Sequence, residues 1–119
     1  QSPALDWRIA QALAYMQAAL PAVPSAAEVA AALHLSPSRF LHLFRKEAGL
    51  TFRRMGLWFK VVRAFQLLPQ VGSLTELAHA SGFADSAHFS RSLRETFGQT
   101  PSQLFQHSQL IQARKEANS

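Results

Sequence analysis

The chain has 119 residues, a length that suits one ordinary domain, and 48% of them are hydrophobic, which is enough for a packed core and excludes a mainly disordered chain. Twelve lysines and arginines against seven acidic residues give a net charge of +5, and this excess favours a polyanionic partner such as nucleic acid or an acidic membrane surface. The chain has no cysteine, which excludes disulfides, cysteine-ligated zinc, iron–sulfur clusters and a thiol nucleophile.

Helical periodicity and helix caps predict seven helices, whereas strand signals are scarce. Over 4–20 one apolar helix face recurs at three- and four-residue steps, formed by Leu5, Ile9, Leu13, Met16 and Leu20. Ser25 followed by Glu28 forms a capping box that opens the second helix. Glycines end three of the later helices, where a left-handed residue is wanted. The predicted helices are 4–20, 26–33, Ser36 to Gly49, 52–68, Ser73 to Gly82, Asp85 to Gly98, and a last one that Thr100 caps, 101–113.

The sequence contains an internal repeat. Ser25, Glu28 and Ala30 recur 48 residues later as Ser73, Glu76 and Ala78, and Phe40, Arg45, Gly49 and Thr51 recur 49 residues later as Phe89, Arg94, Gly98 and Thr100. The one extra residue falls in the turn between Gly82 and Asp85. Each copy is a short capped helix, a tight turn and a longer helix, which is the pattern of a helix-turn-helix. The sequence therefore predicts an all-α fold with two helix-turn-helix modules, 25–49 and 73–98. A long linker helix, 52–68, joins them, and a C-terminal helix, 101–113, follows the second module. Together they form a single DNA-binding domain, 1–119.

In a helix-turn-helix the second helix lies in the major groove of DNA, and its first turns face the base edges. The helical period separates a core face from an outward face on each second helix. The expected core faces are Phe40, Leu43 and Phe44 in the first module and Phe89, Leu93 and Phe97 in the second, with Phe83 also packed inside. The outward faces are Ser38, Arg39, Leu41, His42, Arg45 and Lys46 in the first module, and Ser86, Ala87, Ser90, Arg91, Arg94 and Glu95 in the second.

Positive charge is concentrated in the first recognition helix and the linker helix, where contacts to DNA phosphates are expected. Nine of the twelve cations are arginine, whose planar fork of donors suits phosphates and guanine edges. Between Arg39 and Arg63 seven cations stand against Glu47 alone, a local balance of +6. The predicted phosphate contacts are Arg39, Arg45, Lys46, Arg53, Arg54 and Arg94. At 1.5 Å per residue the linker helix is about 25 Å long, and we expect it to hold the two groove-reading helices about one DNA turn apart.

Two stretches of this sequence resemble the AraC/XylS transcription regulators. The family signature is similar to ASGFADSAHFSRSLRETFGQTPSQLF, Ala80 to Phe105, and the first helix-turn-helix of the family is similar to SPSRFLHLFRKEAGLTFRRM, Ser36 to Met55. The resemblance covers nearly all of 25–108. It implies a seven-helix DNA-binding domain whose two recognition helices enter successive major grooves on one face of double-stranded DNA, attached to a separate ligand-binding or dimerisation domain.

Carried over position by position, the resemblance implies base contacts from both recognition helices, at Ser38, Leu41, His42, Ser86, Ala87, Ser90 and Arg91. The sequence departs from the family pattern in two places. Met55 stands where an aromatic or long residue is common, and Gly56 after it is expected to cost about 1 kcal/mol and to soften the start of the linker helix. Phe105 replaces a frequent arginine, which leaves a phosphate contact from that position unsupported.

Several outward residues have more than one interpretation. Arg91 could contact a base or a phosphate, or it could pair with Glu95. Arg45 and Arg94 could bind phosphates or pair within the protein. His42 is either a DNA contact or a solvated surface histidine.

No catalytic or metal site is predicted. His34, His42, His79, His88 and His107 lack both the four-residue spacing and the nearby carboxylates that a metal site needs, and no cofactor is expected. Asp85, Ser86 and His88 are residue types of hydrolases, but no strand-to-helix elbow holds the serine, and Asp85 is explained as a helix cap. The sequence therefore predicts a protein that is not an enzyme.

The sequence also carries information on the location of the protein, on the extent of the chain and on its partners. Neither a membrane-spanning run nor a signal peptide is found, which predicts a cytoplasmic protein without a membrane partner. The chain starts at Gln1, and we expect it to be a fragment of a longer regulator, an activator, whose effector or dimerisation domain lies elsewhere. RNA polymerase is a further candidate partner. The alternative function is a helical protein-interaction module with a non-specific basic surface.

Overall fold

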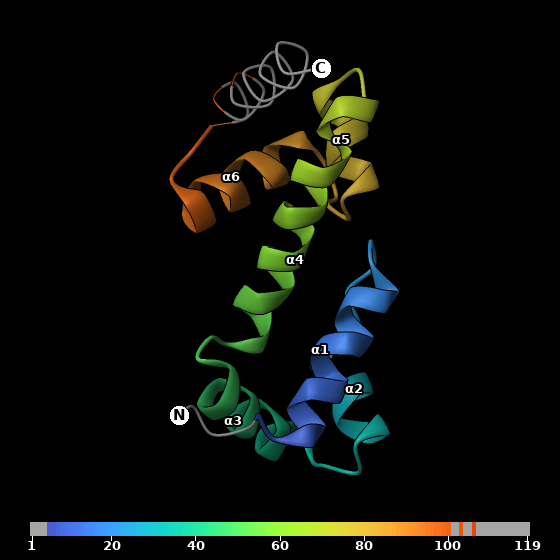
Figure 1. Ribbon diagram of the computed structural model, residues 1–119, viewed down its shortest axis with the longest axis vertical. Coiled ribbons are helices and arrows are strands. Elements are labelled where there is room, and N and C mark those ends of the chain that lie inside the picture. The colour runs from blue at the N-terminus through green and yellow to red at the C-terminus, as the bar shows by residue number, and fades with distance from the viewer. Residues whose placement is uncertain (1–4, 101–102, 104–105, 107–119) are drawn as a thin grey trace, which may run out of the picture. The chain divides into compact units, whose positions relative to one another are not determined.

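The computed structural model describes residues 5–100, 103 and 106, and every regular element among them is a helix (Figure 1). This confirms the all-α class. The α-helices are α1 (Trp7–Ala19), α2 (Ala26–Ala32), α3 (Pro37–Ala48), α4 (Phe52–Leu67), α5 (Leu74–Ala80) and α6 (Ser86–Phe97), and a 3-10 turn, η1 (Leu68–Gln70), follows α4. The chain forms two compact units, Gln1–Phe59 and Lys60–Ser119. Most of the helix expected over 101–113 lies outside the described residues, as do Phe105 and His107.

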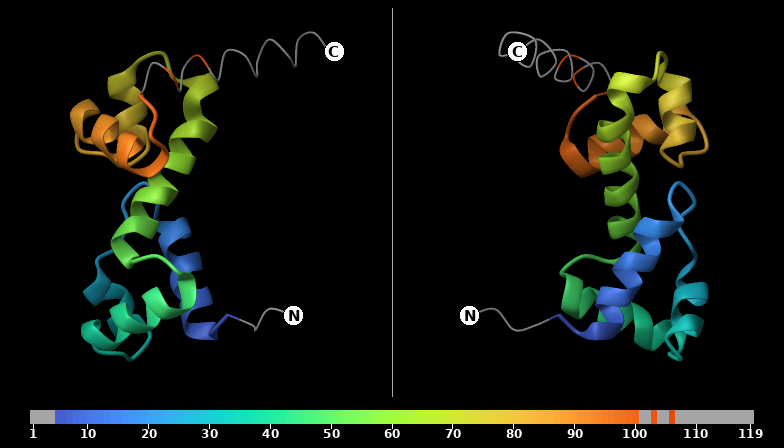
Figure 2. Two further views of the ribbon diagram at one scale, coloured as in Figure 1. Left: turned by 90° about the vertical axis from the view of Figure 1, so that its left-hand side faces the viewer. Right: turned by 45° about the vertical axis from the view of Figure 1, so that its right-hand side comes forward.

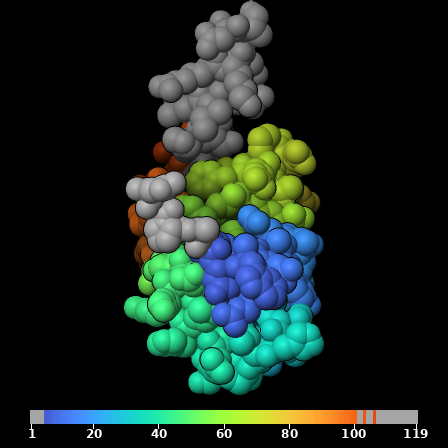
Figure 3. All heavy atoms as spheres, turned by 60° about the horizontal axis from the view of Figure 1, so that its bottom comes forward, coloured from blue at the N-terminus to red at the C-terminus, as the bar shows by residue number. Residues whose placement is uncertain are grey.

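In the first unit, α3 packs against both α1 and α2 (Figure 2). Phe40 and Phe44 on α3 and Phe52 at the start of α4 are buried, and their ring centroids lie 5.4 to 5.8 Å apart with two of the three pairs edge to face. Aromatic rings favour this geometry because the positive edge of one ring meets the negative face of the next. The other buried residues of this core are Ile9, Ala12, Met16, Val29 and Ala30. The atoms of α1 and α2 lie next to one another on the surface of this unit (Figure 3).

The first helix begins later than its apolar spacing predicted. Asp6 is the residue that caps α1, because its side chain accepts the backbone N–H of Arg8. Leu5, which the spacing placed on the core face, therefore precedes the helix and is 42% exposed. Ala12 is buried in the centre of the face, while Leu13 and Leu20 are only partly buried.

The predicted helix caps are present. A side-chain oxygen three residues upstream accepts a backbone N–H at the start of four helices: Ser25 from Glu28, Ser36 from Arg39, Ser73 from Glu76, and Asp85 from His88, at 2.7 to 3.2 Å. Gly49 and Gly98 end α3 and α6 with φ of 81° and 67°, a left-handed conformation that costs glycine little. Thr100 and Gln103 bond each other reciprocally, which is the pattern of a capping box.

The repeat is visible in the turns of the two modules. His34 and Gly82 follow the shorter helices with positive φ of 58° and 97°. In both turns the next amide donates to a carbonyl five residues back, Leu35 to Ala30 and Phe83 to Ala78, each at 2.9 Å. These bonds satisfy carbonyls that a helix end leaves free. Four residues separate α2 from α3 and five separate α5 from α6, so the extra residue lies in the second turn, as the repeat predicted.

In the second unit, α5 and α6 pack together over a core of their own. Phe83 and Phe89 lie 5.1 Å apart between ring centroids, and Phe65 meets Phe97 edge to face at 5.6 Å. Leu77, Ala78 and Leu93 are fully buried with them, as are Val61 and Ala64 of α4. The prediction that Phe40, Phe44, Phe83, Phe89 and Phe97 serve packing is therefore confirmed.

Gly56 has a role that the sequence did not indicate. Helix α4 runs through it without interruption, and the residue is buried. A Cβ atom at this position would lie 3.2 Å from Cγ1 of Val23 and 3.9 Å from Cε of Met16. The missing side chain lets α4 approach the segment after α1 closely, so the expectation of a softened linker start is replaced by one of tight packing.

This packing predicts an energetic coupling between Gly56 and Val23. Alanine should stabilise the helix by about 1 kcal/mol where its methyl group has room. We expect that gain for Gly56→Ala in a Val23→Ala background, and a smaller gain or a loss in the native background. Chemical denaturation of the four proteins gives the coupling energy. Strict additivity of the two substitutions would show that the close approach does not constrain the helix.

Candidate nucleic-acid interface

Helix α3 presents all six of its predicted outward residues to solvent. Because Phe40 and Phe44 fix one face in the core, Ser38, Arg39, Leu41, His42, Arg45 and Lys46 share the opposite face, and each is exposed. Arg53 and Arg54, in the first turn of α4, are also exposed. The Arg54 amide donates to Thr51 Oγ1 at 3.2 Å, which caps this helix.

A surface hollow of about 560 Å³ lies between α3 and the start of α4. Leu41, which is 43% exposed, and Phe52 contribute apolar surface to its lining. Arg45, Lys46 and Arg53 line it with positive charge, together with His42 and Thr51. A smaller hollow of about 380 Å³ is lined by Arg8, Leu35, Ser38, Arg39, His42 and Leu43. Sequence reasoning missed Arg8 and Thr51 here, because no local motif links α1 or the α3–α4 turn to the exposed face.

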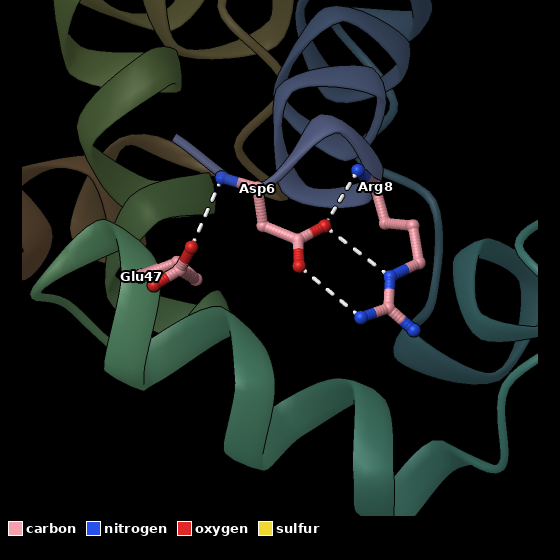
Figure 4. A network of polar contacts seen from close by, with 3 residues as sticks. All are labelled: Asp6, Arg8 and Glu47. Carbon is pink, nitrogen blue, oxygen red and sulfur yellow. Dashed lines mark hydrogen bonds and ion pairs between the residues drawn. The ribbon is translucent and has the colours of Figure 1, made fainter. Parts of the chain in front are cut away.

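A polar contact ties the start of α1 to the last turn of α3 (Figure 4). The backbone N–H of Asp6 donates to Oε1 of Glu47 at 2.9 Å. The Asp6 carboxylate accepts three bonds from Arg8, from its backbone N, Nε and Nη2, at 2.9 to 3.2 Å. These bonds, with the side chain of Arg8 contributing most, lower the pKa of Asp6. Glu47, the single acid among seven cations, thus anchors the helix that carries the exposed face.

Helix α6 offers a second exposed face of different composition. Ala87, Arg91, Arg94 and Glu95 are exposed, whereas Ser86 and Ser90 are half-buried. The hydroxyl of Ser90 donates to the backbone carbonyl of Ser86 at 2.9 Å. Asp6 and Arg8 form the one ion pair among the residues that the structure describes, so the proposed pair of Arg91 with Glu95 does not form. Arg45 and Arg94 likewise have no carboxylate partner in that part of the chain.

Two of the seven cations between Arg39 and Arg63, namely Lys60 and Arg63, make contacts within the second unit and are therefore not available to a partner in the same way as the exposed ones. Nε of Arg63 donates to the carbonyl of Ala80 at 2.8 Å, at the C-terminal end of α5, where carbonyls need donors. Lys60 lies over the ring of Phe83, with Nζ 5.4 Å from the centroid, and burial lowers its pKa. The local balance of +6 therefore overstates the charge that is free to meet a partner.

Asp85 and His88 both make structural contacts, and the described residues hold no cluster of metal ligands. No group of three or more metal-ligating side chains occurs within 5–100 or at the two described residues beyond it. The Asp85 carboxylate caps α6 through the His88 amide, and the His88 ring packs edge to face on Phe83 at 5.3 Å. No helix of the described part is long and apolar enough to cross a membrane.

Comparison with known proteins places this arrangement among regulators. A family model described as a helix-turn-helix domain matches residues 29–107. The HTH-type transcriptional activator RhaS of Pectobacterium carotovorum is 39% identical over 70 residues, which are 57% of this chain and 25% of that protein. The chain spans about a quarter of the length of the curated relatives it matches first.

Two solved structures have the same fold. A transcriptional regulator with an AraC-type DNA-binding domain from Chromobacterium violaceum superposes with a TM-score of 0.77 at 26% identity, over 85% of this chain and 91% of that one. The DNA-binding domain of AdpA, solved in complex with a target DNA, gives a TM-score of 0.76 at 22% identity, over 92% and 96% of the two chains.

The Asp6 network predicts a pH dependence of stability. Because the folded protein lowers the pKa of Asp6, its stabilising effect is present above the ordinary pKa of about 3.9 and is lost as the pH falls through the lowered value. Asparagine caps helices without titrating. Thermal unfolding of Asp6→Asn should therefore depend less steeply on pH below about pH 4 than that of the native chain. Parallel profiles for the two proteins would contradict this.

Proposed function

The chain belongs to the helix-turn-helix family of AraC-type regulators, and from this membership we propose that it is the sequence-specific DNA-binding part of a longer transcription regulator. The observation that carries the proposal is the repeated module. Both α3 and α6 begin with a capped first turn and bury the face that carries phenylalanine. The opposite face of each helix is accessible and combines small polar residues with an arginine or a histidine. A helix that reads a major groove needs such a face.

Affinity and specificity are assigned to different residues. Arg39, Arg45, Lys46, Arg53, Arg54 and Arg94 bind phosphates and release counterions, so affinity falls as salt rises. Ser38, Leu41 and His42 of α3 and Ser86, Ala87, Ser90 and Arg91 of α6 face the bases. The exposure of the cations, and the lack of ion pairs among them within the described residues, supports this division because an unpaired guanidinium keeps all its donors for a ligand.

The proposal extends to parts of the regulator that this chain does not contain. Since the matched segment makes up only about a quarter of the first matched relatives, an effector-binding or dimerisation domain accompanies this one in the proposed regulator. RNA polymerase is proposed as a second partner, with activation of transcription in the cytoplasm as the outcome. The protein has no enzymatic role in this scheme.

A first prediction concerns the length of the binding site. Selection from a random pool of duplex DNA should yield a site with two major-groove contacts on one face of the duplex, about one helical turn apart. Footprinting on that site should show both contacts, and substitutions on the exposed face of α3 or α6 should each weaken one of them. An absence of sequence preference at any salt concentration would favour the interaction module, and a footprint confined to one groove would contradict the two-module mechanism.

A second prediction separates a base contact from a phosphate contact. Arg91→Ala should cost about 1 to 3 kcal/mol on the selected site and relax the preference at one base pair, because a bidentate contact to guanine is lost. The matched control, Arg54→Ala, should weaken binding to selected and random DNA alike and lower the salt slope by about one. Titrations at several salt concentrations measure both effects. Equal losses of Arg91→Ala on both DNAs would move Arg91 to the phosphate backbone.

A further inference from the structure

Leu41 and Ser90 occupy the same position in the two copies of the repeat. The offset of 49 residues that relates Phe40 to Phe89 also relates Leu41 to Ser90. Both follow directly after the buried phenylalanine of their helix, and both are accessible, Leu41 at 43% and Ser90 half-buried. One position of the module therefore carries an apolar side chain in α3 and a hydroxyl in α6.

Leu41 can recognise an apolar group and nothing else. Its side chain has no donor or acceptor, and with Phe52 it lines the hollow beside α3. In the major groove the apolar group that distinguishes one base from the others is the C5-methyl of thymine. Burying that methyl group against Leu41 removes apolar area from water on both sides.

The side chain of Ser90, in contrast, is polar and can only accept a hydrogen bond from a ligand. A hydroxyl has one hydrogen and two lone pairs, and the hydrogen of Ser90 is donated to the Ser86 carbonyl at 2.9 Å. What the side chain offers a ligand is then an acceptor. Only cytosine and adenine present an amino donor in the major groove, at N4 and N6, whereas guanine and thymine present carbonyl oxygens.

We propose that Leu41 and Ser90 make the two modules read opposite kinds of base edge, a thymine methyl group in α3 and an exocyclic amine in α6. This inference rests on the proposed function, because it requires both helices to lie in major grooves. The neighbouring residues extend the contrast. Arg91, a pure donor, complements the acceptor Ser90, so the α6 half of the site combines an amino base with a guanine.

The test uses the native chain and chemically altered duplexes made from the selected site. At the thymine read by Leu41, replacement by deoxyuridine removes the methyl group and should weaken binding roughly fourfold. At the base read by Ser90, an analogue without the exocyclic amine, unsubstituted purine for adenine or pyrimidin-2-one for cytosine, should weaken binding roughly fivefold. The native protein serves in both arms, so the result does not depend on whether a variant folds.

Variants identify the two positions and provide the controls. Leu41→Ser should change the selected base at one position of the α3 half and make binding insensitive to deoxyuridine there. Ser90→Ala should relax one position of the α6 half. Ser90→Thr should retain the preference, since threonine can make the same bond to the carbonyl four residues back.

The outcomes distinguish this inference from the proposed function. Failure of the native chain to select any sequence would reject the proposed function itself. Selection of a specific site that tolerates deoxyuridine at every thymine, or that keeps its profile with Ser90→Ala, would leave the proposed function standing and overturn the assignment of Leu41 or Ser90.

Discussion

The edge-to-face packing of Phe40, Phe44 and Phe52 is the interaction on which the exposed surface of the first unit depends. Two of these rings belong to α3 and the third begins α4, so their contact fixes how both helices are rotated. Once that face is buried, the helical period leaves Ser38, Leu41 and the cations no position except the solvent side. The second unit reaches the same result with one aromatic residue in the turn, Phe83, and one in the helix, Phe89. In both units the packing of aromatic residues in the core therefore determines which face of the helix is exposed.

Most of the fold could be predicted because the signals that define it are local. The serine caps bond an amide three residues away, and Gly49 and Gly98 need a left-handed conformation that depends only on their own backbone. What could not be predicted depends on contacts between distant residues. The Asp6–Glu47 bond spans 41 residues, and the reason for Gly56 is Val23, 33 positions earlier. No spacing rule reaches that far.

The roles of the individual cations also could not be predicted from the sequence, because they too depend on contacts between distant residues. From sequence alone, Arg63, Lys60 and Arg53 are equivalent members of one basic cluster. The fold assigns Arg63 to a helix end and Lys60 to an aromatic ring, and it leaves Arg53 in solvent beside the apolar hollow. The difference lies in which side chains meet an unsatisfied carbonyl or a buried ring when α4 packs. Charge counts therefore locate a basic region but do not say which of its members face outward.

The short reach of the helix caps has a consequence for how quickly the chain acquires its structure. Each α-helix that the structure describes starts from a bond that spans two or three residues. The rings of Phe44 and Phe52 meet within the first unit, and those of Phe83 and Phe89 meet within the second. Closing short loops costs little entropy, and helical proteins rich in local contacts fold on the order of microseconds to milliseconds. Because synthesis adds only about 5 to 20 residues per second, Gln1–Phe59 has time to fold on the ribosome while the rest of the chain is still being made.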